Sequence, residues 1–406
     1  MKTDVLHIVS GLEKGGAEVM LLRLLQRAVQ DDQAFRHHVL SLTGDSVGIA
    51  DDLRNLGVPL SALHLSKRRP QPASIRRFQR ILRSAQPRVI QGWMYHGNVA
   101  ATVAARFASN SPAVVWNVRH SLHELQQERW KVRLSIWLNR YWSRHAHGII
   151  YNSHRAALQH QAYGFDHRST HVIPNGFDVS NALASAHVTR RTMPNVPENA
   201  FVFGFVGRYH HVKGPDLFLQ ALAQAKKQLD RPVHAILAGR GYTKSNGELV
   251  QLLESLGLTK CCHLLGEVSD VPQIMANMDV VVSASRGEGF PNIVGEAMLA
   301  VRPCIVTDVG DSAQLLGDAG MVIPPSNVPE LAQAMCEFAT MSPDERSRLG
   351  RLGRERIEKH YSLESVYRQY HAFYASLLPA PARRTTRKTL DLSGSIESSA
   401  TAASLH

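Results

Sequence analysis

The sequence has few of the features that mark secreted, metal-dependent or membrane-spanning proteins. It has only four cysteines in 406 residues, and Cys261, Cys262, Cys304 and Cys336 form no CxxC pair or other metal or disulfide spacing. No apolar run approaches the roughly 20 residues that a bilayer-spanning helix needs. No Asp-x-Asp triplet is present to hold a divalent cation on a diphosphate. We therefore expect core thiols, no essential metal, no cofactor and no transmembrane segment.

Composition is that of an ordinary globular protein, with 44% hydrophobic, 20% charged and 7% aromatic residues. A chain of 406 residues is long for one hydrophobic core, which favours two domains. The first ten residues lack a small-residue cleavage site and make a poor secretory signal. They predict a cytoplasmic location.

Positive charge is concentrated in the first half of the chain. The formal net charge is +12, and residues 1–180 hold 23 Lys and Arg against 12 Asp and Glu, so they carry +11 of it. This asymmetry indicates an anionic partner for the first half, such as a membrane surface, a phosphorylated substrate or nucleic acid. A soluble basic face is the alternative interpretation.

Short apolar runs recur every 20 to 40 residues, and segments with helical spacing separate them. This pattern is typical of βα units around a parallel sheet, and it occurs twice. The expected strands are Val5–Val9, His38–Leu42, Arg88–Gly92, Val114–Val118, Gly148–Tyr151 and His171–Ile173, then Val202–Val206, Val233–Ala238, His263–Leu265, Val280–Ser283, Cys304–Thr307 and Met321–Ile323.

The two sets of strands predict two α/β domains that face a central cleft. Residues 1–178 form the first and 179–362 the second, which starts with a polar linker, Val179 to Ala200. An amphipathic helix is expected at Leu363 to Leu377, and the Ser/Thr/Ala-rich tail at 379–406 is expected to be disordered. A cleft between two such domains would be lined by strand ends and helix N-termini.

The segment Ser283 to Pro291 reads as a strand end followed by a Gly-rich loop and a helix start. Glu288 lies in the loop, and Glu296 lies about a turn and a half into the helix. An open helix N-terminus suits a phosphate, and a carboxylate one turn deeper can accept hydrogen bonds from vicinal ribose hydroxyls. Two solvated surface charges would give the same pattern.

Two cations follow an earlier strand. Arg208 and Lys213 occupy the turn between a strand that ends at Gly207 and a helix that begins near Pro215. Fixed cations at this spacing can clamp a diphosphate, although both could equally be ordinary exposed side chains.

The first domain offers two weaker signals. Gly15 and Gly16 lie between the first strand and an apolar helix, in a pattern that matches neither a dinucleotide fingerprint nor a phosphate loop. His120 follows the strand that ends at Val118, where the cleft is expected. The pairs His145/His147 and His210/His211 lack a third metal ligand.

Together these motifs resemble the retaining glycosyltransferases of family four, which have the GT-B fold of two Rossmann-like domains. The motifs that carry the resemblance are GGAE at 15–18, His120, IPNGFD at 173–178, GR-x4-KG at 207–214, EGFPNIVGEAM at 288–298 and TDVGD at 307–311. The acidic pair with its EGFPN context is the most specific of them.

The resemblance implies a role for each matching residue. Arg208 and Lys213 would bind the donor diphosphate, Glu296 the ribose hydroxyls, and Glu288 the donor sugar. The backbone of Phe290, Pro291, Asn292 and Ile293 would complete the phosphate-binding site, and the backbone at Gly266 and Val268 would run beside the nucleotide base. His120 would contact the donor sugar, Gly15 and Gly16 would border the diphosphate and the acceptor, and the final helix, 363–378, would cross back to the first domain.

The implied function is metal-independent transfer of a sugar, most simply from a UDP-sugar, to a glycan or lipid-linked glycan in lipopolysaccharide or exopolysaccharide biosynthesis. A nucleotide-sugar epimerase or phosphorylase on the same fold is an alternative. Nucleic-acid binding is a weaker one, because no groove-reading helix, RNP aromatic pair or zinc pattern is present.

Residues 67–88 form a strongly basic segment. They hold eight Lys and Arg without one acid, and Ile75, Phe78, Ile81 and Leu82 fall on one face of a helix between Pro72 and Pro87. This pattern favours peripheral docking on the cytoplasmic face of an anionic inner membrane. The alternative is a solvated outer helix of the first domain.

Overall fold

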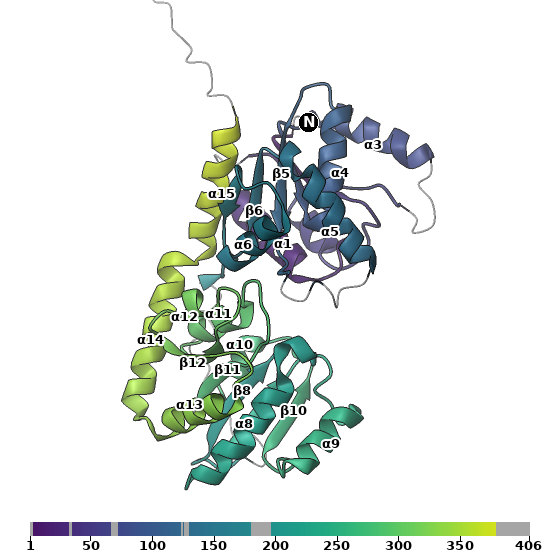
Figure 1. Ribbon diagram of the computed structural model, residues 1–406. Coiled ribbons are helices and arrows are strands. Elements are labelled where there is room, and N and C mark those ends of the chain that lie inside the picture. Colours follow the sequence, from purple (N-terminus) through teal and green to yellow (C-terminus); the bar gives the residue numbers. More distant parts are fainter. Residues whose placement is uncertain are drawn as a thin grey trace, which may run out of the picture.

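The computed structural model describes residues 3–31, 35–65, 72–122, 125, 130–179 and 196–378. Two α/β domains lie one above the other, and the last two helices run along one side of both (Figure 1). Most of the linker expected between Val179 and Ala200 and the tail expected at 379–406 lie outside the described residues.

The N-terminal domain contains a parallel sheet of seven strands in the order β3-β2-β1-β4-β5-β6-β7. The strands are β1 (Val5–Val9), β2 (His37–Ser41), β3 (Leu60–Ala62), β4 (Val89–Trp93), β5 (Ala113–Val118), β6 (Gly148–Tyr151) and β7 (Thr170–Val172). The helices are α1 (Gly16–Val29), α2 (Ala50–Asn55), α3 (Pro72–Ala85), α4 (Met94–Phe107), α5 (Trp130–Trp142), the short turn η2 (Ser143–His145) and α6 (His154–Tyr163).

The C-terminal domain repeats this topology with six parallel strands in the order β10-β9-β8-β11-β12-β13. The strands are β8 (Phe201–Val206), β9 (Val233–Ala238), β10 (Cys262–Gly266), β11 (Val280–Ser283), β12 (Cys304–Thr307) and β13 (Gly320–Ile323). The helical elements are η3 (His211–Lys213), α8 (Pro215–Gln228), α9 (Gly247–Ser255), α10 (Val271–Met275), α11 (Asn292–Leu299), α12 (Ser312–Leu316), α13 (Val328–Thr340), α14 (Pro343–His360) and α15 (Leu363–Leu377).

The sequence periodicity located the strands well. Each of the twelve expected strands is present, with its ends within one residue of those predicted. The pattern missed only β3, because this edge strand is three residues long and lies just after Pro59, without an apolar run. Two Rossmann-like parallel sheets confirm the expected fold class.

The last helix leaves the C-terminal domain and packs on the N-terminal one. Val366, Tyr370 and Phe373 of α15 are buried in the same cluster as β1 and α1 side chains. The Asn117 amide on β5 donates a hydrogen bond to the Tyr370 hydroxyl at 2.8 Å. Helix α15 therefore covers the N-terminal sheet, and α14 and α15 run alongside the two domains (Figure 1).

Most of the apolar stripe of the basic helix α3 packs against its own domain, and residues 67–71 of the basic segment lie outside the described residues. Ile81 and Leu82 are buried and Phe78 packs against the same core cluster, while Ile75 remains half exposed. The cations of α3 point outward. The apolar stripe thus builds the domain core, as the alternative interpretation of this segment expects. Among the described residues, no helix is both long and apolar enough to cross a bilayer.

Candidate active site

The Gly-rich loops follow the central strands of the two sheets. In each sheet the strand order reverses direction between two neighbours, β1 and β4 in the first domain and β8 and β11 in the second. Ligands of parallel α/β sheets bind outside the carboxyl ends of the strands at such a point. The loop with Gly15 and Gly16 follows β1, the loop with Arg208 and Lys213 follows β8, and the loop with Glu288 follows β11.

Two ion pairs tie the β8 and β11 loops together. The Lys213 ammonium lies 2.5 Å from Oε1 of Glu288, and the same oxygen accepts a hydrogen bond from the Ser285 hydroxyl at 2.7 Å. Behind this pair, both terminal nitrogens of Arg286 donate to the Asp216 carboxylate, at 2.8 and 2.6 Å. A bidentate Arg–carboxylate pair fixes orientation as well as distance, so it holds the two loops in one relative position.

Close backbone packing requires a glycine in the Lys-Gly pair. Gly214 has a φ of +69°, and a Cβ there would lie 2.1 Å from the carbonyl oxygen of Ala284, at the end of β11. The left-handed conformation at Gly214 ends the η3 turn and starts α8, and it brings Lys213 toward Glu288.

The two expected clamp cations differ in their surroundings. Arg208 is exposed directly after β8. Lys213 is 29% exposed and engaged with Glu288, whose side chain is 9% exposed. The structure therefore brings Lys213 and Glu288 together in a half-buried pair, whereas Arg208, five residues earlier in the chain, is exposed.

Helix α11 begins where the motif predicts, with Pro291 as its N-cap residue and Asn292 as its first helical residue. Ile293 is half-buried on the first turn. Phe290 is a core residue whose ring packs between those of Phe177 and Tyr361, so only its backbone can face a ligand.

Glu296 lies on the second turn of α11, near the other domain. Its carboxylate is 3.8 Å from Nη2 of Arg23 on α1, and both side chains are 30% exposed. Burial raises the pKa of Glu296, and the charge of Arg23 partly opposes that rise. An elevated carboxylate pKa indicates a group that would gain from added hydrogen-bond donors.

The other expected residues of the two domains occupy strand or helix ends. Gly15 is the N-cap residue of α1 and Gly16 its first residue, and both are exposed. Gly266 ends β10 with a φ of +65°, and Val268 follows it, half-buried, in the next loop.

His120 connects to a buried aromatic chain. Its Nδ1 is 3.3 Å from the Tyr95 hydroxyl, which is 2.8 Å from Nε2 of His160. The other nitrogen of His160, Nδ1, donates to the carbonyl of Ala156 at 2.8 Å, because a carbonyl can only accept. In neutral His160, Nε2 then accepts the Tyr95 proton, and the Tyr95 oxygen accepts from His120. This chain fixes the ring orientation of His120.

The burial of His160 predicts acid sensitivity. His160 is fully buried, and burial lowers its pKa to about 4, despite the opposing bond to Ala156. The unfolded chain, with an ordinary histidine pKa, therefore binds more protons between pH 6.5 and 4. We expect His160 to make the free energy of unfolding about 2 kcal/mol lower at pH 5 than at pH 8.

Urea unfolding of the wild type and of His160→Gln at both pH values isolates the contribution of His160 to the pH dependence of stability. The other buried histidines contribute equally in both proteins. The glutamine can keep both hydrogen bonds and cannot take up the proton. An equal loss of stability in the two proteins would refute the assignment.

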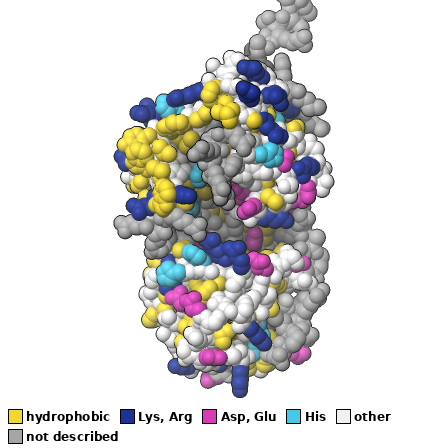
Figure 2. Space-filling view, turned by 90° about the vertical axis from the view of Figure 1, so that its right-hand side faces the viewer, with side chains coloured by type: hydrophobic (Ala, Val, Ile, Leu, Met, Phe, Trp, Pro, Cys, Tyr) yellow, Lys and Arg dark blue, Asp and Glu magenta, His cyan; other side chains and the backbone are white. Residues whose placement is uncertain are grey.

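The domains contact each other through polar groups near these loops. The Asp311 carboxylate accepts hydrogen bonds from the backbone N–H groups of His154 and Arg155, at 2.7 and 3.0 Å, and so caps α6 of the other domain. The Asn175 amide donates to the side-chain oxygen of Asn292 at 2.5 Å, and Asn175 also accepts from Arg119. Figure 2 shows cationic and histidine side chains along the edge of the C-terminal domain that faces the N-terminal one.

Sequence reasoning missed several of these supporting residues. Asp311 and Asn175 lie in motifs whose presence was noted without a role, TDVGD and IPNGFD. Arg286, Asp216 and His160 carried no local signal, because their partners are distant in sequence.

Within the described ranges, no group of three or more His, Cys, Asp and Glu side chains is arranged to hold a metal ion. All four cysteines are free.

Comparison with known proteins identifies related families. Residues 14–181 match the model of Glycosyltransferase Family 4, and residues 200–340 match that of Glycosyl transferases group 1. The lipopolysaccharide core biosynthesis mannosyltransferase LpsB of Rhizobium meliloti is 30% identical over 192 residues, which are 45% of this chain and 53% of LpsB. The chain thus spans about half the length of this relative. The putative glycosyltransferase EpsF of Bacillus subtilis is 22% identical over 75% of this chain and 79% of EpsF.

Solved structures share the fold along almost the whole described chain. Anabaena HepE, solved in complex with UDP, superposes with a TM-score of 0.76 at 22% identity, covering 92% of this chain and 100% of HepE. Sucrose-phosphate synthase of Thermosynechococcus elongatus superposes with a TM-score of 0.72 at 16% identity, covering 92% of this chain and 99% of that one. With one family model on each domain and the GT-B fold throughout, the chain belongs to the group 1 glycosyltransferases of family four.

Proposed function

We propose that this protein is a retaining glycosyltransferase that moves a sugar from a nucleotide-diphosphate donor, a UDP-sugar, to a glycan or lipid-linked glycan. The observation that carries the proposal is the junction of the β8 and β11 loops. There Lys213 contacts Glu288, and α11 begins just after the β11 loop. Parallel sheets generally bind ligands at such a point, which supports the proposal.

The charges at this junction suit a diphosphate leaving group. A glycosidic bond to a diphosphate breaks only if the negative charge that develops on the departing nucleotide is stabilised. Lys213, the exposed Arg208 on the same loop and the N-terminus of α11 would supply that stabilisation without a metal ion. In the ligand-free protein Glu288 compensates Lys213, so a bound diphosphate would share this cation.

The comparisons support the donor and acceptor classes. HepE was solved in complex with UDP and, separately, with UDP-glucose, and LpsB is named for lipopolysaccharide core biosynthesis. We therefore assign UDP to the C-terminal domain and a cell-surface polysaccharide intermediate to the N-terminal domain. Gly15 and Gly16 would border the diphosphate and the acceptor, His120 would contact the donor sugar, and Gly266 and Val268 would lie near the base.

Binding of UDP to Glu296 variants tests the nucleotide site. We expect Glu296→Gln to weaken UDP binding about 10- to 100-fold, because hydrogen bonds to a charged group contribute on the order of 1.5 to 3 kcal/mol. Isothermal titration calorimetry measures the affinity. The penalty should disappear with 2′,3′-dideoxy-UDP, which has no hydroxyls for the carboxylate to bind.

The matched control is Glu355→Gln, an exposed carboxylate on α14. It should bind UDP as the wild type does. A Glu296→Gln penalty that persists with the dideoxy nucleotide would remove the ribose contact from the proposal. A panel of UDP-, GDP- and ADP-sugars in thermal-shift assays identifies the base, and product analysis with a labelled donor separates transfer from epimerisation or phosphorolysis.

A further inference from the structure

Helix α5 has an apolar face that nothing in the described chain covers. Ser135, Ile136 and Asn139 face the domain, and the Asn139 amide donates to the Tyr95 carbonyl at 3.1 Å. The opposite face carries five large hydrophobic side chains that are 40 to 67% exposed. They are Trp130, Leu134, Trp137, Leu138 and Tyr141, whose spacing places them on one stripe of the helix.

This concentration is unusual for a soluble surface. Only twelve large hydrophobic side chains are exposed among the described residues, and five of them lie on this thirteen-residue helix. Figure 2 shows a group of hydrophobic side chains on the N-terminal domain with Lys and Arg around it. A contiguous apolar patch rimmed by polar groups marks an interaction surface.

The charged residues within α5 are all positive, whereas the acid Glu128 precedes the helix in the sequence. Lys131, Arg133 and Arg140 on the helix and Arg144 just after it are exposed, and no acid occurs between Trp130 and Arg144. The cationic face of α3 belongs to the same domain, and α4 packs against both helices. Trp and Tyr prefer the boundary between lipid headgroups and acyl chains, and anionic headgroups attract Lys and Arg.

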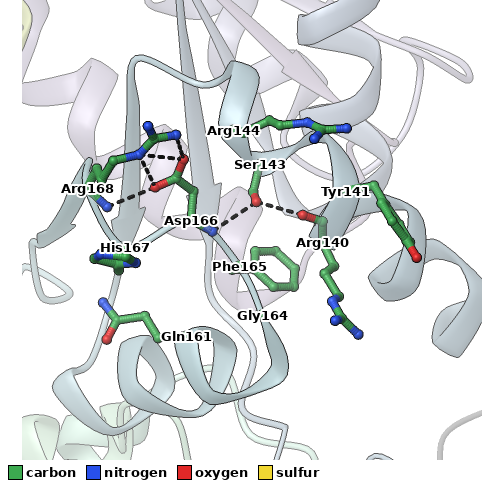
Figure 3. A pocket seen from close by; sticks show the side chains of 10 residues that line it. All are labelled: Arg140, Tyr141, Ser143, Arg144, Gln161, Gly164, Phe165, Asp166, His167 and Arg168. Carbon is green, nitrogen blue, oxygen red and sulfur yellow. Dashed lines mark hydrogen bonds and ion pairs between the residues drawn. The ribbon is translucent and has the colours of Figure 1, made fainter.

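A pocket adjoins the C-terminal end of this apolar face. It has a volume of 640 Å³ and is lined by residues of the α5 end, η2, α6 and the loop before β7 (Figure 3). Tyr141 belongs to both the apolar face and the pocket, so the two surfaces are continuous. Arg140, Arg144, His167 and Arg168 line it, against a single acid, Asp166.

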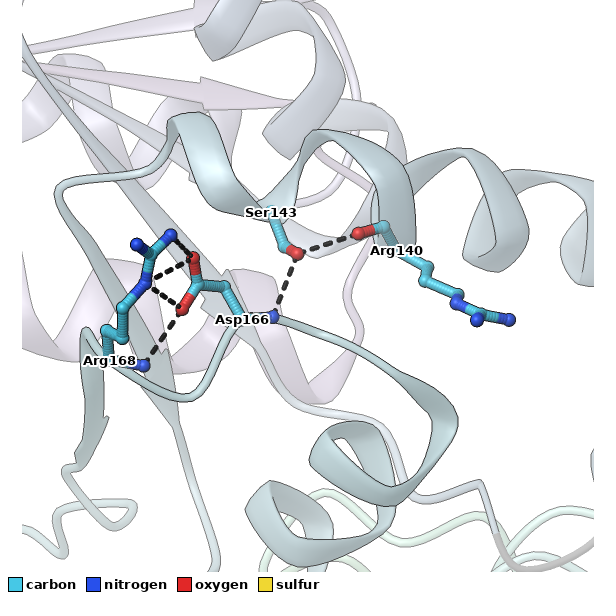
Figure 4. Close-up of polar contacts among 4 residues, drawn as sticks. All are labelled: Arg140, Ser143, Asp166 and Arg168. Atoms are coloured by element: carbon cyan, nitrogen blue, oxygen red, sulfur yellow. Dashed lines mark hydrogen bonds and ion pairs between the residues drawn. The ribbon is translucent and has the colours of Figure 1, made fainter.

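The one acid of the pocket is already neutralised. Arg168 donates to both oxygens of the Asp166 carboxylate, with the shortest contact at 2.6 Å, and the Asp166 N–H donates to the Ser143 hydroxyl at 2.9 Å (Figure 4). This pairing with Arg168 lowers the pKa of Asp166 to about 2. Arg140 and Arg144 remain as the excess positive charge of the pocket.

We propose that the exposed face of α5, with the cation-lined pocket at its end, docks on an anionic lipid bilayer. The Trp, Leu and Tyr side chains would enter the headgroup region, while Arg144 and its neighbours would bind lipid phosphates. This assigns the anchoring role to α5 in place of the apolar face of α3, which builds the core. The proposal concerns binding alone, so it can hold or fail independently of the transfer reaction.

Vesicle flotation of the full chain tests the proposal. We expect binding to phosphatidylcholine vesicles that contain 30% phosphatidylglycerol and little binding to pure phosphatidylcholine. Leu134→Ser/Trp137→Ser should lower the partition coefficient about tenfold or more for each side chain that no longer enters the bilayer. Arg133→Glu/Arg144→Glu should lower it by at least about 30-fold, and salt should weaken binding of the wild type.

Matched controls separate these effects from general ones. Val322→Ser, at 41% exposure, and Arg351→Glu both lie in the C-terminal domain and should bind vesicles as the wild type does. Circular dichroism and thermal melting check that each variant is folded. Equal binding by the α5 variants and the wild type would overturn the proposal. So would sedimentation velocity that shows a dimer dissociated by Leu134→Ser/Trp137→Ser, because a second copy would then occupy the face.

Discussion

Replacing Lys213 with alanine should lower kcat by about 10²- to 10³-fold, the loss seen when one preorganised donor to a developing oxyanion is removed. We expect this because the variant lacks the half-buried cation that would stabilise the negative charge developing on the departing diphosphate. Arg208→Ala should have a similar effect, because the two side chains lie on the same β8 loop. Release of UDP from UDP-glucose, with and without acceptor, measures the rate.

Two comparisons make this result specific. Lys227→Ala removes an exposed lysine of α8 and should leave the rate unchanged. Lys213→Arg keeps a positive charge and should recover part of the activity. If Lys213 served only to pair with Glu288, Lys213→Ala would lower the free energy of unfolding and leave kcat unchanged. Near wild-type turnover in either alanine variant would discredit the diphosphate clamp.

Replacing Gly295 with alanine should destabilise the protein by about 3 kcal/mol, even though alanine is normally the better helix former by about 1 kcal/mol. A Cβ at Gly295 would lie 2.1 Å from the ring of Phe177, which is itself 1% exposed in the core. Because Gly295 precedes Glu296 on α11, relief of this clash should also displace the proposed ribose ligand. Urea unfolding measures the stability, and UDP calorimetry measures the site.

Gly247→Ala provides the opposite case. Gly247 is the first residue of α9, and nothing lies within 4 Å of the position its Cβ would take. This variant should be as stable as the wild type or slightly more stable. Equal stability of the two alanine variants would show that α11 is free to shift away from Phe177.

Local motifs predicted the parts of the candidate site that lie on a single loop. Pro291 before an apolar helix located the N-terminus of α11, and Gly207 with Gly214 bracketed the cationic turn. The same motifs carried no information about partners. Whether Lys213 would meet Glu288, 75 residues away, depended on how the β8 and β11 loops approach each other.

The basic segment at 67–88 shows the limit of a helical pattern. An amphipathic helix has the same sequence whether its apolar stripe meets lipid or its own domain, so the pattern fitted both interpretations. In the structure Ile81 and Leu82 are buried against the N-terminal sheet. The exposed apolar face belongs to α5. Its sequence does not show which face of the helix is buried, and in the structure the Asn139 hydrogen bond to Tyr95 marks the buried face.

The sequence by itself determined the two parallel sheets, the order of their strands along the chain and the family, because these depend on short-range periodicity and contiguous motifs. The tertiary structure alone decided which side chains share a site. The Asp311 cap on α6 and the His120–Tyr95–His160 chain join residues that lie far apart in sequence, whereas the return of α15 to the first domain was already implied by the family resemblance. Such contacts follow from how distant segments pack, within the N-terminal domain for His160 and between the domains for Asp311, and no local pattern encodes them.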